Sequence, residues 1–277
     1  MTSSATPKRG GRAAFTLVEL LVVIAIIALL ISILLPTLSK VKRKAQQVGC
    51  ASGLKQIYIA MTLFAQDHQG HLPRPYFVGE LSSDPNFQKF NAWSQQVSGA
   101  SGHIDLDDNK GALWPYIKGS ETRKKVLMCP GDDGEALAGH PTMVAWPRNV
   151  SYSFNQHIYR DPFNGGRISY GVTLSSVHES SVRIMIYEEM APNDSWCIMG
   201  YSGDDIPSGR HSFNMNQAFR NNPNSAQYKN LGRGNHCFFD GHVEALAPAQ
   251  VLPPSQGGQI GSERYHTPLV KGDPLVW

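Results

Sequence analysis

The chain opens with an abrupt change from polar to apolar residues. Residues 1–14 are small, polar and basic, whereas residues 15–35 are apolar except for Thr16, Glu19 and Ser32. A helix needs roughly 20 consecutive apolar residues to cross the hydrocarbon core of a bilayer. The pattern therefore predicts a leader over residues 1–14 and a transmembrane helix over residues 15–35.

A helical pattern continues beyond Pro36, the residue at which a bend is expected. Residues 36–70 carry apolar side chains at three- or four-residue steps and predict a helical spine on which a domain can pack. The helix is expected to end at Gln69-Gly70, because glycine commonly follows the last turn of a helix. The side chains predicted to share one face are Leu38, Val41, Ala45, Val48, Ala51, Leu54, Tyr58, Met61 and Ala65.

Residues 71–247 break into short apolar pieces separated by Gly, Pro, Asn and Asp, which predicts a globular domain. The expected strands are Val126–Cys129, Ser151–Asn155, Val182–Glu188, His236–Phe239 and His242–Leu246. Asp240-Gly241 predicts a two-residue type I′ turn with positive φ at both residues, and with Phe238 paired to Val243. Long loops are expected over residues 200–233, and a Pro/Gly-rich tail over residues 248–277. The expected fold class is α+β, a long N-terminal helix packed on a small antiparallel sheet with long loops.

Charge and cysteine content narrow the class of protein. The formal net charge is +3. Lys8, Arg9 and Arg12 supply three positive charges, so loss of the leader leaves 3 − 3 = 0 and gives no electrostatic basis for binding nucleic acid. The four cysteines form no C-x-x-C pair, which excludes zinc ribbons and thioredoxin-type motifs. An even number permits disulfides if the domain lies outside the cytoplasm.

The apolar segment differs from an ordinary secretory signal, whose small-residue cleavage site follows the apolar region instead of preceding it. A plain membrane anchor would leave Glu19 unexplained. A carboxylate inside a membrane span costs roughly 2.5–3.5 kcal/mol on insertion scales and usually has a dedicated partner. Both simpler explanations are therefore weaker than one that gives the carboxylate a role.

Ala14-Phe15-Thr16-Leu17-Val18-Glu19-Leu20, with the apolar run after it, resembles the cleavage and methylation motif of type IV prepilins and type II secretion pseudopilins. The resemblance implies that a prepilin peptidase cuts between Ala14 and Phe15 and methylates Phe15. It also implies that Glu19 pairs with the amino terminus of a neighbouring subunit and that Pro36 kinks the helix. The family usually has glycine before the cut, where this chain has Ala14. The implied topology is a single pass through the bacterial inner membrane, with the N-terminus cytoplasmic and the domain outside.

A second resemblance covers the globular part, through Gly49–Ile57, Met128-Cys129-Pro130, Ser151–Asn155 and Cys237–Glu244. In order, these segments are similar to a large bacterial family of prepilin-type proteins of undefined function. That family ends in a histidine, nine residues and Asp-Gly. Here His211 matches the histidine, but Asp240 follows 29 positions later, which implies an insertion near Phe213–Leu231.

Three candidate binding or cross-linking sites follow from residue types. Asp105–Gly111 resembles a calcium loop, but its glycine is displaced and Tyr116 occupies the position expected for glutamate. Type II secretion major pseudopilins bind calcium, although a solvated polar loop is the simpler explanation here. His211, His236, His242 and Asp240 could bind a transition metal. Asp240 is needed by the turn, and His236 and His242 would face opposite sides of a regular hairpin. We therefore expect the domain to carry no cofactor and no transition-metal centre.

The third site is a disulfide between Cys50, on the spine, and Cys129, at a strand end. It is one choice, because four cysteines permit three pairings.

Two functions remain open at this stage. The first is a structural subunit, assembled through its N-terminal helix in a pilus or secretion pseudopilus. Its partners would be prepilin peptidase, other pilin or pseudopilin subunits and the membrane. The second is a membrane-tethered binding protein or carbohydrate-active enzyme that uses the prepilin route for export, with tryptophans as sugar platforms. We favour the first and expect no enzymatic activity.

Overall fold

The computed structural model describes residues 16–73, 111–132, 150–154, 173–191, 206–211, 230 and 232–251. The chain divides into two compact units, Met1–Lys42 and Arg43–Trp277. Helix α1 (Leu17–Asp67) begins in the first unit and ends in the second.

The first unit contains the apolar part of α1. Among the described residues, α1 is the one helix long and apolar enough to cross a membrane, and its apolar side chains from Leu17 to Leu35 are exposed. Ser32 donates its hydroxyl hydrogen to Leu29 O at 2.7 Å, which satisfies a polar group within the apolar run. Pro36 lies inside α1, and the helix continues beyond it.

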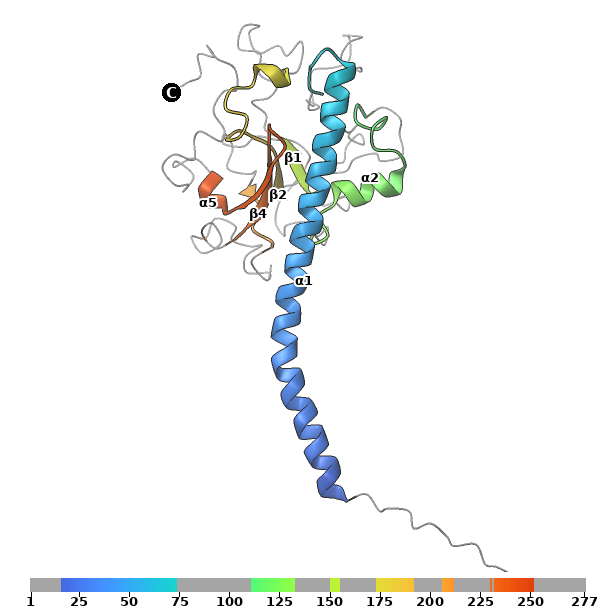
Figure 1. The fold of residues 1–277 in the computed structure, drawn as a ribbon, viewed down its shortest axis with the longest axis vertical. Helices are drawn as coiled ribbons and strands as arrows, with labels where there is room; N and C mark the ends of the chain where they lie inside the picture. The colour runs from blue at the N-terminus through green and yellow to red at the C-terminus, as the bar shows by residue number, and fades with distance from the viewer. Residues whose placement is uncertain are drawn as a thin grey trace, which may run out of the picture. The chain divides into compact units, whose positions relative to one another are not determined.

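The second unit contains an antiparallel sheet in the order β1-β2-β4-β5 (Figure 1). Its strands are β1 (Tyr152–Phe154), β2 (Ile184–Ala191), β4 (Gly234–Phe238) and β5 (Val243–Leu246). Strand β3 (Ile206–Pro207) pairs with the far end of β2 beyond a register shift. The α+β class predicted from the sequence is confirmed, and four of the five expected strands are present.

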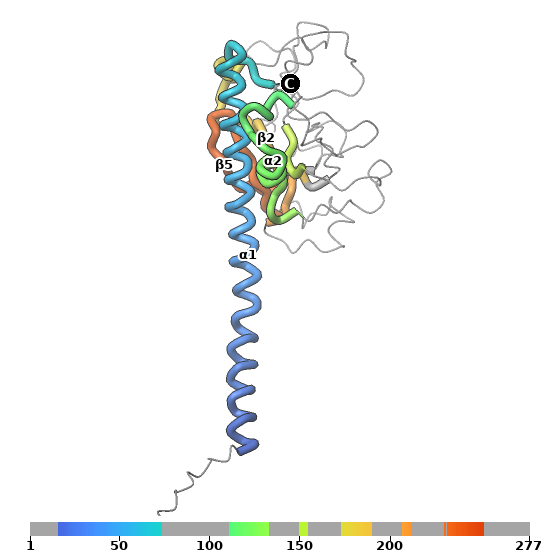
Figure 2. Tube along the Cα trace, turned by 90° about the vertical axis from the view of Figure 1, so that its right-hand side faces the viewer, coloured from blue at the N-terminus to red at the C-terminus, as the bar shows by residue number. Residues whose placement is uncertain are grey.

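The later turns of α1 share one hydrophobic core with this sheet (Figure 2). Within α1 the buried residues are Cys50, Gly53, Leu54, Ile57, Ala60, Met61, Phe64 and Ala65. The predicted face was right for Leu54, Met61 and Ala65 but wrong for Val48, which is 60% exposed. Several apolar stripes run along a helix this rich in apolar residues, and contact with the sheet decides which one is buried.

The expected strand Val126–Cys129 is wrong, because Val126 and Leu127 belong to helix α2 (Ser120–Leu127). Its buried residues are Arg123, Val126 and Leu127, at the i, i+3 and i+4 spacing of a helix face. The apolar pair alone cannot distinguish a strand from a helix. Two short helices, η3 (Leu174–Ser176) and α5 (Pro248–Val251), complete the described elements.

The end of α1 agrees with the prediction. Gln69 and Gly70 both have positive φ, and Gly70 N–H donates to Ala65 O at 2.7 Å, which closes the helix.

The β4–β5 hairpin exists, but its turn differs from the expected type I′. Gly241 has a φ of 84°, whereas Asp240 is not among the described residues with positive φ. Gly241 N–H donates to Phe238 O, and Phe238 N–H donates to His242 O. These bonds describe a three-residue loop with glycine in the left-handed position. The additional loop residue moves the register, so Val243 pairs with Cys237 and not with Phe238.

Candidate functional site

The N-terminus of α1 is closed by a reciprocal pair of contacts between Thr16 and Glu19. Glu19 Oε2 accepts hydrogen bonds from Thr16 N and Thr16 Oγ1, both at 2.8 Å. In return, Glu19 N–H donates to Thr16 Oγ1 at 3.2 Å. This is a capping box, which satisfies amide hydrogens that the first turn of a helix leaves free. Ala14 and Phe15, the predicted cleavage and methylation residues, lie outside the described part of the chain.

The capping box gives Glu19 a local role in addition to the predicted contact with a neighbouring subunit. Its carboxylate is exposed and belongs to the first turn of α1. The N-terminal end of a helix is positive, so a carboxylate is favourable at this position. The two roles are compatible, because a carboxylate has more acceptor sites than Thr16 uses.

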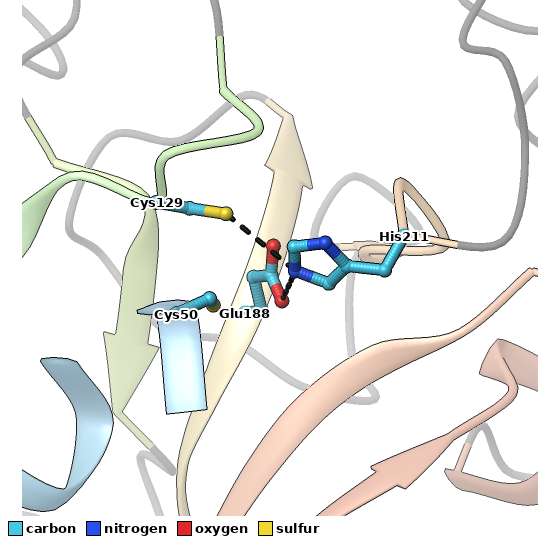
Figure 3. Close-up of side chains that lie close together, drawn as sticks. All are labelled: Cys50, Cys129, Glu188 and His211. Atoms are coloured by element: carbon cyan, nitrogen blue, oxygen red, sulfur yellow. Dashed lines mark hydrogen bonds and ion pairs between the residues drawn. The ribbon is translucent and has the colours of Figure 1, made fainter. Parts of the chain in front are cut away.

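A second group of reactive side chains lies inside the Arg43–Trp277 unit. Cys50, Cys129, Glu188 and His211 place their ligand-type atoms within 4.8 Å of one another (Figure 3). They come from α1, the segment after α2, strand β2 and the segment after β3. His211 Nε2 lies 2.9 Å from Glu188 Oε2 and 3.5 Å from Cys129 Sγ. All four residues are buried.

Hydrogen-bond donors point at three of these four side chains. Tyr152 Oη donates to Cys50 Sγ at 3.3 Å. Gly131 N–H donates to Cys129 Sγ at 3.3 Å, across the turn made by Cys129-Pro130-Gly131. Asn235 N–H donates to Glu188 Oε2 at 3.1 Å. Donors directed at sulfur favour the thiolate over the thiol.

An ion-pair network borders the cluster. Arg210 Nη1 lies 2.6 Å from Asp132 Oδ2, and Arg210 Nε lies 3.4 Å from Glu188 Oε1. Ser151 Oγ also donates to Asp132 Oδ2, at 2.7 Å. Glu188 Oε1 is buried and has no hydrogen-bond partner among the described residues. This oxygen of the central carboxylate therefore faces the Arg210 guanidinium without accepting a hydrogen bond.

The charges in this group shift one another's protonation. Burial acts to raise the pKa of Glu188, but His211 and Arg210 hold it well below its usual range. Burial acts to lower the pKa of His211, but Glu188 and Cys129 raise it to about 9. Burial raises the pKa of Cys50 well above its ordinary value. Burial also acts to raise the pKa of Cys129. Hydrogen bonds with Cys50 and His211 and the charge of Arg210 outweigh burial and lower this pKa to about 7.

The structure does not bring together the histidines that the sequence grouped. His236 is buried and stacks on Tyr187, with ring centroids 6.3 Å apart. His242 Nδ1 lies 2.6 Å from Asp240 Oδ1 on the hairpin, whereas His211 belongs to the buried cluster. Asp240 also accepts a bond from His242 N–H at 3.0 Å, which agrees with its expected use in the turn.

Two other predicted sites have different outcomes. Cys50 and Cys129 do lie close together, but both are free thiols in this structure, so their disulfide stays a prediction. In the proposed calcium loop, residues 105–110 lie outside the described residues, as does most of the expected insertion near Phe213–Leu231.

Sequence reasoning did not find Glu188, Arg210 or Asp132 as site residues. Glu188 sits within an apolar strand that reads Ile-Met-Ile-Tyr-Glu-Glu, so a charge at a buried strand position was the available signal. Arg210 carries no motif of its own, although it precedes His211, the histidine that the second resemblance singles out.

Comparison with known proteins assigns the N-terminal segment to a family. Residues 9–35 match the prokaryotic N-terminal methylation motif. The competence protein ComGC of Bacillus subtilis (strain 168) is 39% identical over 75 residues, which are 27% of this chain and 74% of that protein. The ComG operon protein 3 homolog of Bacillus licheniformis is 32% identical over 75 residues, with the same coverage. The type IV major pilin protein PilA of Myxococcus xanthus (strain DK1622) is 29% identical over 92 residues, 33% of this chain and 40% of that protein.

No solved structure matches the chain. The methylation motif, the apolar N-terminal helix and the sheet packed on its later turns define a pilin- or pseudopilin-type subunit. The chain belongs to the family of prepilin-like proteins that includes ComGC.

Proposed function

We propose that this protein is a structural subunit that assembles through its N-terminal helix into a pilus or a secretion pseudopilus, and that it is not an enzyme. The observation that supports this most is a single acidic residue, Glu19, in the first turn of an exposed apolar helix within the methylation motif. A carboxylate inside a membrane span is unfavourable and usually has a dedicated partner, which a neighbouring subunit in a packed bundle of helices can supply.

Processing is the first step of the proposed function. A prepilin peptidase cuts between Ala14 and Phe15 and methylates Phe15, and the subunit is held in the bacterial inner membrane with its N-terminus cytoplasmic. The matched motif at residues 9–35 supports this proposal, as do the relatives named as a type IV major pilin and a competence protein.

The test of processing is mass spectrometry of the N-terminal peptide of the membrane-bound protein. We expect a peptide that begins with methylated Phe15. A protein that retains Met1, or one cut after Leu35, would contradict the proposed processing.

Assembly is the second step, and Glu19 is the residue that we expect to direct it. In the structure its carboxylate accepts hydrogen bonds from Thr16 N and Thr16 Oγ1. In a filament the same carboxylate would pair with the amino terminus of a neighbouring subunit. Pairing compensates the charge inside the bilayer, where an unpaired carboxylate is unfavourable.

The matched pair of variants Glu19→Ala and Thr16→Ala separates pairing from capping. Each removes part of the capping box, worth roughly 0.5–2 kcal/mol of helix stability. Only Glu19→Ala removes the charge. We expect both variants to reach the membrane, and only Glu19→Ala to be missing from sheared surface filaments examined by electron microscopy and immunoblotting. Equal incorporation of the two variants would refute the pairing.

A further inference from the structure

The four clustered side chains have the composition and spacing of a metal site. Two cysteines, one histidine and one glutamate are ligands that zinc accepts. A tetrahedral zinc ion with bonds of about 2.0–2.3 Å separates its ligand atoms by roughly 3.3–3.8 Å. Here His211 Nε2 lies 3.5 Å from Cys129 Sγ and 2.9 Å from Glu188 Oε2, and all four ligand atoms lie within 4.8 Å of one another. Shifts of less than about 1 Å would reach tetrahedral coordination.

We propose that Cys50, Cys129, Glu188 and His211 bind one divalent zinc-class ion, which fastens helix α1 to the sheet. The ligands belong to α1, the turn after α2, strand β2 and the segment after β3. One ion would therefore join segments that are far apart along the chain. The sequence predicts no transition-metal centre in the domain, because it groups His211 with His236, His242 and Asp240. The proposed site departs from that prediction and uses His211 with Cys50, Cys129 and Glu188.

The surroundings of the cluster are those of metal ligands. Metal-bound thiolates and carboxylates are generally held by outer hydrogen bonds. Here Tyr152 Oη donates a hydrogen bond to Cys50 Sγ, Gly131 N–H donates to Cys129 Sγ, and Asn235 N–H donates to Glu188 Oε2. Glu188 Oε1 accepts no hydrogen bond and lies 3.4 Å from the Arg210 guanidinium, so the carboxylate keeps lone pairs for a metal ion.

Charge also agrees with a divalent ion. Two thiolates and one carboxylate carry three negative charges, so a divalent ion leaves one. The Arg210 guanidinium lies 3.4 Å from Glu188 Oε1 and faces that remaining charge, while its other end pairs with Asp132. Calcium does not suit the site, because calcium requires six to eight oxygen ligands.

The proposed role is structural. Catalytic zinc ions keep a coordination position open to water or substrate, whereas structural ones are enclosed by four protein ligands. Exposure of Cys50 and Glu188 is 0%, of Cys129 1% and of His211 6%, so solvent has little access to the site.

A disulfide between Cys50 and Cys129 is the competing use of the same two sulfurs, and an oxidising compartment would favour it. It uses only two of the four converging groups. For this reason the geometry favours the ion, and the two alternatives exclude each other.

The test measures the metal content of the full chain, purified in detergent without chelators. In a parallel sample, the thiols are blocked at harvest. Elemental analysis should give one equivalent of zinc per chain. Exchange for Co(II) should give the intense thiolate charge-transfer and ligand-field bands of tetrahedral cobalt. Cys129→Ser and Glu188→Gln, which preserve side-chain shape, should lose the metal and the bands and lower the thermal unfolding temperature.

Cys237→Ser is the matched control, because Cys237 is also a buried free thiol but lies outside the cluster. It should retain the ion and the cobalt spectrum. Two results would overturn the proposal: a Cys50–Cys129 disulfide in the blocked sample without bound metal, or a metal content that Cys129→Ser and Glu188→Gln leave unchanged. Near-ultraviolet circular dichroism establishes that each variant is folded, and none of these readouts depends on filament assembly.

Discussion

Gly241 is the point at which the β4–β5 hairpin contacts helix α1, and alanine at this position should destabilise the domain. Gly241 has a φ of 84°, and an added Cβ would lie 2.7 Å from Tyr58 Cζ and closer still to Tyr58 Cε1. Tyr58 has little freedom to move, because its hydroxyl donates to Phe239 O at 3.2 Å. Lys55 Nζ donates to Gly241 O at 2.6 Å, on the same contact.

Two penalties add at this residue. A left-handed conformation costs a residue with a Cβ roughly 1–2 kcal/mol. Insertion of a methyl group into packed surroundings costs roughly 1–3 kcal/mol. Alanine also restricts the unfolded chain, which stabilises the folded state by about 0.4–1 kcal/mol. We therefore expect Gly241→Ala to lower the free energy of unfolding by roughly 2–4 kcal/mol.

Gly70→Ala is the matched control for the backbone penalty. Gly70 has a φ of 88°, but its nearest atom to an added Cβ is Thr173 Cβ at 3.8 Å, an ordinary contact. We expect it to lower the free energy of unfolding by only about 1 kcal/mol. Urea unfolding of both variants, followed by circular dichroism in detergent, gives the comparison. If Gly241→Ala is no more destabilising than Gly70→Ala, the inferred collision with Tyr58 is refuted.

Two further predictions concern stability. Burial lowers the pKa of His236 from 6.5 to about 4, so the unfolded chain takes up a proton at this residue at a higher pH than the folded chain does. Stability should fall by up to roughly 3 kcal/mol as the pH drops from about 6.5 to about 4. His236→Gln should flatten that part of the pH dependence of the urea midpoint, and an unchanged slope would contradict the assignment. Alanine ordinarily stabilises a helix relative to glycine by roughly 0.5–1 kcal/mol. At Gly53 the added Cβ would lie 2.9 Å from Val126 O, so Gly53→Ala should lower the thermal unfolding temperature while the exposed control Ser52→Ala leaves it nearly unchanged. A stabilising Gly53→Ala would show that α1 can move away from α2.

The features that the sequence predicted well depend on neighbours along the chain. The apolar run after residue 14 and the glycine that ends α1 at Gly70 are local signals. The hairpin at Asp240-Gly241 is also local, and its existence was predicted although its turn type was not. Local geometry determines these elements, because a helix end or a tight turn is satisfied by bonds among adjacent residues.

Only the tertiary structure decided which face of α1 is buried and how its side chains are used. Val48 and Cys50 both lie on the predicted spine, yet Val48 is 60% exposed and Cys50 is wholly buried. Whether Val126-Leu127 forms a strand or a helix likewise depended on the surface against which the pair packs.

The buried cluster had the weakest signal in the sequence. His211 lies 82 positions from Cys129 and 23 from Glu188, and no spacing rule connects them. The pairing of β2 with β3 and β4, and the packing of α1 across the sheet, bring these residues together. A metal or catalytic motif is visible in a sequence when one turn or helix carries its ligands. Here four separate elements each carry one, so only their packing in three dimensions could assemble the site.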